Sequence, residues 1–320
     1  MRTLRVGLIC LGVLLACPAT TFAEAAPGFS KQWGGTGELD APYHMVLDNE
    51  GALYVTDSDH NRILVFDAEG TLLRSWGTKG AEPGEFNIPS GIGIDADQYI
   101  YIGDSDNHRI QKFDRYGKFI LKFGSFGEGT GRFNFPVGVA IDDDGYIYVA
   151  DQWNSRVQKF TAQGEFVLTW GSYGSGQGRF DLPTAVVLHE GLVYVGDVKN
   201  NRIQIFDPVG NPRGRIGSEG TNPGQFTLPY SLTFAPDGNL YVTDSGNDRI
   251  QVFNPQHQVI AVWGETGTGP GQFDLPWGIA VDNDGNVFIA DSLNDRIQKF
   301  VPGGVAVEPV TWGRLKSRSQ

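Results

Sequence analysis

Cysteine is nearly absent from the sequence: only Cys10 and Cys17 occur among 320 residues, and both lie close to the N-terminus. The rest of the chain therefore forms no disulfide, in whatever compartment it resides. Long hydrophobic runs are scarce as well. The most extended one, residues 6–17, has about 12 residues, whereas a helix needs about 20 to span a bilayer. We expect no membrane-spanning segment.

The first residues have the three-part layout of a secretory signal. Arg2 and Arg5 precede the apolar run, and small residues that end at Ala23 follow it. We therefore expect residues 1–23 to be a signal peptide, cleaved near Ala23 or Ala25, with residues 24–27 as a short linker. The mature protein would be secreted or periplasmic.

A lipid anchor is the alternative form of export. Residues 14–17 also resemble a bacterial lipobox, in which the signal ends before Cys17 and this cysteine carries the lipid. Under that interpretation the same protein is a membrane-anchored lipoprotein.

Positive charge is in deficit, with 25 Lys and Arg against 37 Asp and Glu and a formal net charge of −12. Loss of a leader that contains Arg2 and Arg5 takes this charge from −12 to −14. Such a chain repels polyanions, so we expect no binding of nucleic acid. The partners that suit it are a protein or a small neutral or cationic ligand, and we expect a monomer.

Histidine is rare too, and its spacing does not indicate a metal site. None of the five forms a pair such as H-E-x-x-H: His44, His60, His108, His189 and His257. The acidic runs at Asp142 and Asp282 lack the glycine and distal glutamate of a calcium loop, and Asp-Gly is first a hairpin signal. We predict neither a metal site nor a cofactor; zinc and calcium are the alternatives.

One short sequence motif, in contrast, recurs along the chain. "DSGNDRIQVF" starts at Asp244 and has five variants elsewhere in the chain. Its first aspartate and its arginine recur at intervals of 47, 47, 46, 47 and 47 residues, in the pairs Asp57 and Arg62, Asp104 and Arg109, Asp151 and Arg156, Asp197 and Arg202, Asp244 and Arg249, and Asp291 and Arg296. Six repeats of one unit therefore make up most of the chain.

Each repeat contains four short strand-like runs separated by turn residues, and no window shows a helical period. A period of this length with four strands is typical of a propeller blade. We predict an all-β fold, a six-bladed β-propeller of four-stranded antiparallel blades over residues 28–313. The repeats are expected at about residues 39–77, 86–124, 133–171, 180–217, 226–264 and 273–313.

The ring needs one strand from the opposite end of the chain. Residues 28–34 end in the Trp-Gly that closes other repeats, so we expect Phe29 to Trp33 to complete blade six. The run 305–312, which contains Pro309, would then be an outer edge, where proline is tolerated. Residues 314–320 form a basic tail.

These repeats resemble NHL repeats, a family of propeller blades, and the resemblance covers nearly all of the mature chain. Repeat three shows the motif from "GRFNFPVGVAIDDDGYIYVAD" through "NSRVQKF" to "TWG". In such a blade the aspartate ends the second strand and the arginine starts the third. Because the pair occurs in every blade, we interpret it as structural.

Function is expected where one blade differs from the others. The residue after each repeat proline should lie near the channel mouth, and it is aromatic in blades one, five and six: Tyr43, Tyr230 and Trp277. Trp153 and Tyr173 are expected in loops of the same face. His44 stands where the other repeats have glycine, alanine or serine. These six residues are our candidate binding site; packing between blades is the alternative interpretation.

The resemblance implies three kinds of function. Peptide-amidating lyases hold zinc with histidines directly after the repeat proline, and this chain has Tyr43, Ser90, Val137, Thr184, Tyr230 and Trp277 there. RNA-binding relatives use a basic face, which this acidic chain lacks. A third group acts as extracellular sensor or interaction domains. We therefore expect no catalytic residues and an exported binding scaffold, with a metal-dependent, lyase-like enzyme as the alternative.

Overall fold

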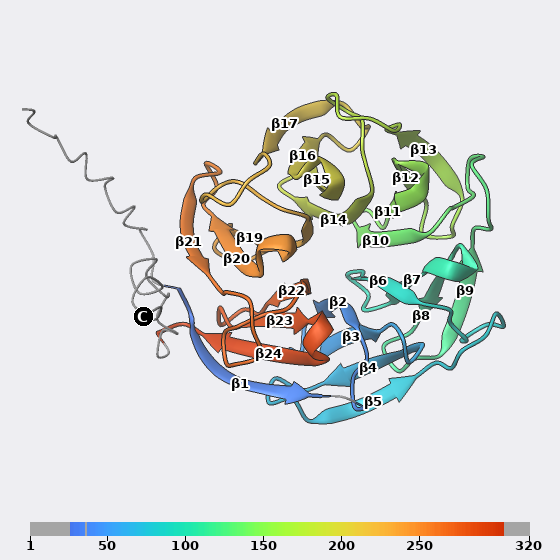
Figure 1. Ribbon diagram of the computed structural model, residues 1–320. Helices are drawn as coiled ribbons and strands as arrows, with labels where there is room; N and C mark the ends of the chain where they lie inside the picture. Colours follow the sequence, from blue (N-terminus) through green and yellow to red (C-terminus); the bar gives the residue numbers. More distant parts are fainter. Residues whose placement is uncertain (1–25, 36, 304–320) are drawn as a thin grey trace, which may run out of the picture.

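The chain folds into a closed ring of six blades around a central channel (Figure 1). The computed structural model describes residues 26–35 and 37–303. Each blade is a four-stranded sheet, and all neighbouring strands within a blade run antiparallel. The expected all-β, six-bladed propeller is confirmed. In the part of the chain that the structure describes, no helix has the length and apolarity to cross a membrane.

The strands take equivalent places in every blade. The inner strands, which surround the channel, are β2 (Pro42–Leu47), β6 (Pro89–Ile94), β10 (Pro136–Ile141), β14 (Pro183–His189), β18 (Pro229–Phe234) and β22 (Pro276–Val281). The second strands are β3 (Leu53–Asp57), β7 (Ile100–Asp104), β11 (Ile147–Asp151), β15 (Leu192–Asp197), β19 (Leu240–Asp244) and β23 (Val287–Asp291). The third strands are β4 (Arg62–Phe66), β8 (Arg109–Phe113), β12 (Arg156–Phe160), β16 (Arg202–Phe206), β20 (Arg249–Phe253) and β24 (Arg296–Val301). The outer strands are β5 (Leu72–Trp76), β9 (Phe119–Phe123), β13 (Phe166–Trp170), β17 (Pro212–Ile216), β21 (Val259–Trp263) and β1 (Gly28–Gly34).

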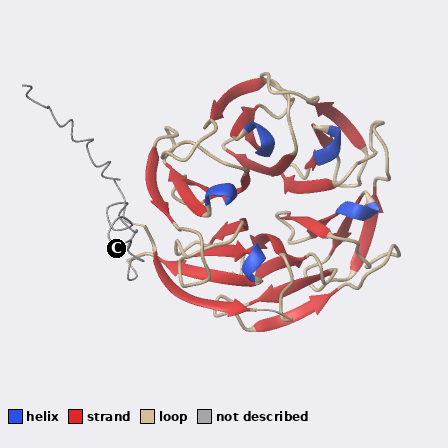
Figure 2. Ribbon diagram, in the orientation of Figure 1, coloured by secondary structure: helices blue, strands red, loops and turns tan. Residues whose placement is uncertain are grey.

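One face of the ring carries the turns between second and third strands and the connections between blades; we call it the connection face. Five of these turns contain a short 3-10 helix: η1 (Ser105–Asn107), η2 (Gln152–Asn154), η3 (Val198–Asn200), η4 (Ser245–Asn247) and η5 (Ser292–Asn294) (Figure 2). The residue after each helix adopts a left-handed conformation. The hairpin turns that join first to second strands and third to outer strands lie on the opposite face; blade six has only the first kind, because its outer strand β1 comes from the other end of the chain.

Aromatic rings join each blade to the next. The last aromatic residue of an outer strand packs on the third-strand phenylalanine of the following blade, with ring centroids 5.9 Å apart for Trp76 and Phe113 and 5.0 Å apart for Phe123 and Phe160. Rings at these separations attract one another beyond the area that they bury. The aromatic repeat positions therefore form the interfaces between blades.

The first described strand closes the ring. β1 pairs with β24 and so becomes the outer strand of blade six, the place expected for residues 29–33 (Figure 1). Trp33 then packs on Phe66 of blade one at 6.0 Å, as the outer-strand aromatics do elsewhere. Chain segments from the two ends of the sequence thus share one sheet. The expected outer edge at residues 305–312 lies outside the described residues.

The repeated aspartate and arginine form the corner between second and third strands. In blade two, the Arg109 Nε donates a hydrogen bond of 2.6 Å to the fully buried Asp104 carboxylate, which also accepts from the Asn87 and Gln111 nitrogens. The rest of the guanidinium donates to backbone carbonyls of the preceding connection, including that of Glu85. Burial raises the pKa of this carboxyl and of its counterparts at Asp151, Asp197 and Asp291.

Serine side chains in the same corner form hydrogen bonds that join four of the blades to the next blade in the ring. Each hydroxyl donates to the carbonyl of the next blade's inner-strand proline, as from Ser58 to Pro89 (2.7 Å) and from Ser105 to Pro136 (2.6 Å). Ser292 makes the same bond to Pro42 at 2.6 Å, which joins blade six to blade one across 250 residues of sequence. The ring is therefore held near the channel as well as at its outer edge.

Candidate functional site

The three aromatic residues that follow repeat prolines in blades five, six and one form one cluster. Trp277 stacks on Tyr230 at 5.5 Å with 22° between the ring planes, and Tyr43 lies 5.0 Å from Trp277 and 5.7 Å from Tyr230. Tyr43 is buried, whereas its two neighbours are partly exposed. Burial, with the nearby Tyr230 hydroxyl, raises the pKa of Tyr43, so all three side chains are neutral at physiological pH.

The cluster is possible because ring closure makes blades five, six and one neighbours. The equivalent residues of the other three blades are Ser90, Val137 and Thr184, all fully buried. Small side chains on that side leave the channel mouth asymmetric. The three rings pack on one another, and the nearest cavity lies deeper in the channel, lined by residues further along the inner strands.

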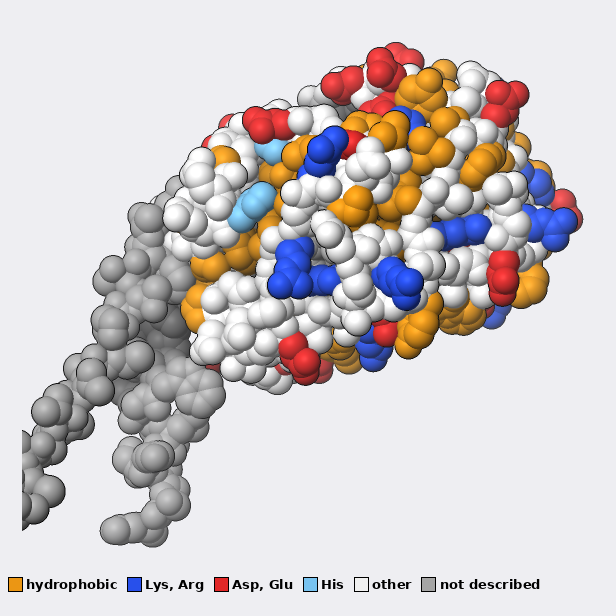
Figure 3. Space-filling model, turned by 90° about the horizontal axis from the view of Figure 1, so that it is seen from above, with side chains coloured by type: hydrophobic (Ala, Val, Ile, Leu, Met, Phe, Trp, Pro, Cys, Tyr) orange, Lys and Arg blue, Asp and Glu red, His pale blue; other side chains and the backbone are white. Residues whose placement is uncertain are grey.

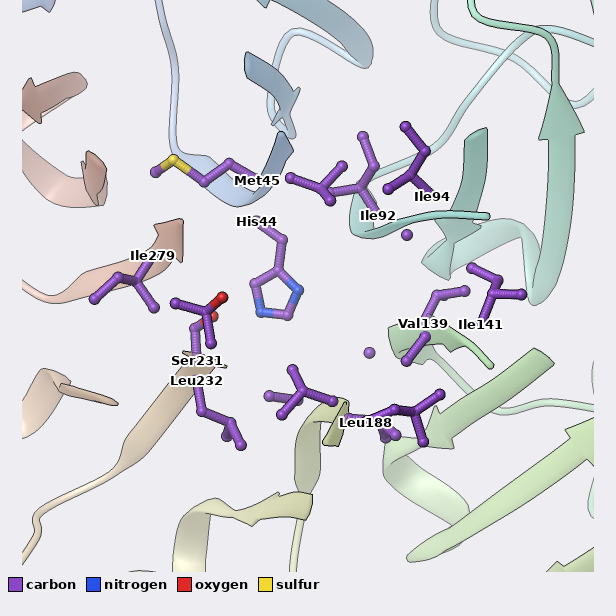
Figure 4. A pocket seen from close by; sticks show the side chains of 18 residues that line it. His44, Met45, Ile92, Ile94, Val139, Ile141, Leu188, Ser231, Leu232 and Ile279 are labelled. Atoms are coloured by element: carbon purple, nitrogen blue, oxygen red, sulfur yellow. The ribbon is translucent and has the colours of Figure 1, made fainter. Parts of the chain in front are cut away.

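His44 points into that cavity (Figure 4). Its side chain is 7% exposed, and its backbone exchanges two hydrogen bonds with the Thr56 hydroxyl. Burial alone lowers the pKa of His44 to about 4. The imidazole is therefore neutral near pH 7, with one ring nitrogen able to donate and the other able to accept a hydrogen bond.

The low pKa of His44 predicts a specific loss of stability in acid. The unfolded chain protonates this residue below about pH 6.5, whereas the folded protein resists protonation until about pH 4. The stability present above pH 6.5 is thus lost as the pH falls toward 4. Between pH 7 and 4, we expect the free energy of unfolding to fall about 2–3 kcal/mol further in the wild type than in His44→Leu.

Urea unfolding at a series of pH values measures this difference. The buried aspartates whose pKa is raised act in the opposite direction, because the folded protein takes up their protons more readily than the unfolded chain. They are common to both proteins, so their effect cancels in the comparison. Parallel pH curves for the wild type and His44→Leu would contradict the assignment.

Trp153 and Tyr173 both lie on the connection face, and their side chains are 55% and 72% exposed. Trp153 occupies η2 of blade three, and Tyr173 the connection that leads to blade four. Trp153 stacks on Phe135 with centroids 4.8 Å apart and 12° between the planes. One face of its indole is thus supported by the protein while half of the side chain meets solvent.

Phe135 has an unusual backbone conformation, which directs its side chain toward Trp153. The residue before every inner-strand proline has a positive φ: Ala41, Ile88, Phe135, Leu182, Leu228 and Leu275. The left-handed region costs a residue other than glycine about 1–2 kcal/mol. In compensation, the Phe135 amide donates to His108 Nδ1 of the preceding blade at 3.2 Å. An asparagine or aspartate accepts the equivalent bond from Ile88, Leu228 and Leu275.

These contacts create an aromatic strip across blades two and three. The Phe126 ring lies 4.8 Å from His108, His108 accepts from Phe135, and Phe135 stacks under Trp153. We define the aromatic strip as these four residues. Phe126 is 63% exposed. Phe126 and Phe135 are not among the residues predicted from the sequence, although Phe126 takes a repeat position that is Lys79, Tyr173, Glu219 or Thr266 in other blades.

Figure 3 shows part of the outer edge of the ring, where side chains of one kind do not gather into a distinct site. This view, from the side that carries β13 and β17, shows basic and acidic side chains scattered among hydrophobic and uncharged ones. Phe166 and Val167 of β13 are among the exposed hydrophobic residues of this edge. The connection face is therefore the better candidate for a binding surface.

The described residues contain no group of three or more His, Cys, Asp or Glu side chains placed to hold a metal ion. The acidic turns have a local role: the Asp142 and Asp282 carboxylates accept hydrogen bonds from the backbone and side chains of their own hairpins.

Six four-stranded blades in a closed ring define the class of this protein, a six-bladed β-propeller. Within that class, three of its repeats are NHL repeats. Residues 133–160, 226–253 and 273–300 match the NHL repeat, and residues 41–114 match a family described as a 6-bladed beta-propeller. No curated protein is similar enough to match the sequence.

Several solved structures share the fold at low sequence identity. Virginiamycin B lyase from Staphylococcus aureus is 15% identical, with a TM-score of 0.60 over 85% of this chain and 98% of its own. A gluconolactonase from Xanthomonas campestris is 16% identical, with a TM-score of 0.63 over 91% and 99%. Hydrazine synthase from Kuenenia stuttgartiensis is 11% identical, with a TM-score of 0.60 over 83% and 97%. At these identities the likeness shows the fold alone.

Proposed function

We propose that this protein is an exported binding propeller without catalytic activity, and that it recognises a protein partner through the aromatic strip. One observation carries the proposal: the strip is contiguous and partly exposed, and Tyr173 is the one aromatic residue at the equivalent positions between other blades. A tryptophan that rests on a second ring offers a large contact area at a small cost in conformational entropy, as anchors of protein interfaces do.

The surroundings of the strip indicate the chemistry of the partner. Asp106 and Glu128 are exposed in the two loops that carry His108 and Phe126, while Arg132 is the exposed basic residue of the same connection. The whole chain has a net charge of −12. A peptide segment with an aromatic or aliphatic anchor and a neutral or positive charge fits this face best.

Selection of a displayed random-peptide library on the purified protein tests the proposal. We expect the selected peptides to be rich in aromatic, aliphatic and basic residues, and to lose about 30-fold in affinity on Trp153→Ala, the loss typical of a buried anchor. Leu293→Ala is the matched control, because Leu293 has the same place in η5 and is 51% exposed. Equal affinity for both variants would contradict the proposal.

An enzyme is the second candidate function, since two of the proteins that share the fold are a lyase and a gluconolactonase. At sequence identities of 15% and 16%, the similarity supports a shared fold but does not support a shared reaction. Metal analysis of the purified mature protein separates the two candidates. Stoichiometric zinc would favour the lyase-like alternative.

Export is a separate part of the proposal and rests on the N-terminal sequence. Mass spectrometry of the native N-terminus distinguishes its two forms. Cleavage near Ala23 or Ala25 gives a secreted or periplasmic protein, and a lipid on Cys17 gives an anchored one. An intact residue 1–23 segment would contradict export by either route.

A further inference from the structure

The channel contains a second feature that sets blade one apart. A cavity of about 270 Å³ lies between the inner strands, and most of the side chains that line it are aliphatic, with Ile92, Val139, Leu188, Leu232 and Ile279 among them (Figure 4). An engineered apolar cavity of about 150 Å³ already accommodates benzene. The space therefore suits a molecule of one ring or a short aliphatic chain.

His44 has the largest polar side chain in this wall, where Ser231 and Thr233 contribute only hydroxyl groups. The equivalent residues are Gly91, Gly138, Ala185, Ser231 and Gly278. At the three glycines an added Cβ would collide with backbone atoms of the next blade's inner strand. Three blades thus exclude a side chain here and two have only a small one, whereas blade one places a complete imidazole in the channel.

The imidazole has an unused hydrogen-bonding group. Its Nε2 is buried and has no hydrogen-bond partner among the described residues. A buried polar atom left unpaired costs about 1–3 kcal/mol. A partner from outside the protein would remove that cost, and the aliphatic walls would add the favourable burial of its apolar part.

We infer that the channel is a binding site for a small, neutral, mainly apolar molecule that exchanges one hydrogen bond with the His44 imidazole. A charged ligand is disfavoured, because the cavity walls offer no charge to balance it and desolvation would be costly. The Tyr43, Tyr230 and Trp277 cluster stands at the mouth of this channel, and Tyr43 lies 5.2 Å from the His44 ring. The site is independent of the aromatic strip.

Phenol and toluene are the probes, because they share shape and size while phenol alone carries a hydroxyl. In protein labelled with ¹⁵N-histidine, we expect phenol to shift the His44 ring nitrogens saturably at pH 7. His44→Leu should weaken phenol about tenfold, the loss expected for one buried hydrogen bond. Toluene, followed through the methyl signals of Ile92 and Val139, should bind His44→Leu as well as the wild type or better.

Two blocking variants from different blades, Leu188→Trp and Ile141→Trp, should abolish the binding of both probes by filling the cavity. Their melting temperatures show whether the ring is intact, and either one that folds suffices. Trp153→Ala should bind both probes normally, so the channel site is tested apart from the aromatic strip. The inference is overturned if phenol leaves the His44 signals unchanged, if a folded blocking variant binds as the wild type does, or if His44→Leu weakens both probes equally.

Discussion

A variant that lacks residues 28–34 should lose cooperative unfolding, because it loses the strand that closes the ring. β1 supplies the outer edge of blade six and places Trp33 between Phe66 and Phe288, at 6.0 and 6.2 Å. The lost aromatic burial and backbone hydrogen bonds amount to about 5–10 kcal/mol, as much as the net stability of many domains. Thermal unfolding followed by circular dichroism and calorimetry measures the effect.

Two point variants of β1 separate the contribution of the Trp33 side chain from that of an exposed position in the same strand. Trp33→Ala should lower the free energy of unfolding by about 3–5 kcal/mol, as truncation of a packed aromatic does. Ser30→Ala, at an exposed position of the same strand, should change it by less than about 0.5 kcal/mol. A deletion variant with a wild-type melting curve would show that β1 does not hold the ring closed.

Asp104→Ala should be the most damaging single substitution in blade two. It leaves the Arg109 guanidinium, the Gln111 amide and the Asn87 backbone amide without their shared acceptor in a buried corner. Removal of one partner from a buried ion pair costs about 3–5 kcal/mol, mostly because the other charge is left uncompensated. Urea unfolding monitored by tryptophan fluorescence gives the value.

Asp106→Ala is the control for this substitution, since it removes an exposed carboxylate from the same turn. We expect a change within about 0.5 kcal/mol. If both variants were equally stable, the repeated pair would be a surface ion pair, worth no more than about 1 kcal/mol.

The architecture follows from the sequence to an unusual degree, because each structural role is repeated six times. The intervals between the arginines predict the number of blades, and the Trp-Gly at residues 33–34 indicates the closing strand. Repetition also defines neighbours. Once the ring is closed, Tyr230, Trp277 and Tyr43 belong to consecutive blades, so the sequence alone predicts that they lie close together.

Other features depend on geometry that the sequence does not contain. Phe135 reaches Trp153 through a positive φ before a proline, where an extended conformation is the usual expectation. The link between His108 and Phe135 joins residues of different blades, and the serine bonds to proline carbonyls involve backbone atoms. The cavity beside His44 is a space between six strands, and its volume depends on how closely they approach.

We expect a division of roles in this protein: residues shared by all blades build the ring, while residues particular to one blade bind. Alanine substitution at one turn position in five blades, at Asp59, Asp106, Trp153, Lys199 and Leu293, tests it with a peptide selected on the wild-type protein. We expect five unchanged melting temperatures, a loss of about 30-fold in affinity for Trp153→Ala, and only a small loss for Asp106→Ala, whose carboxylate lies in the loop that carries His108. Similar losses in all five variants would contradict it, because binding would then follow the repeat and not the exception.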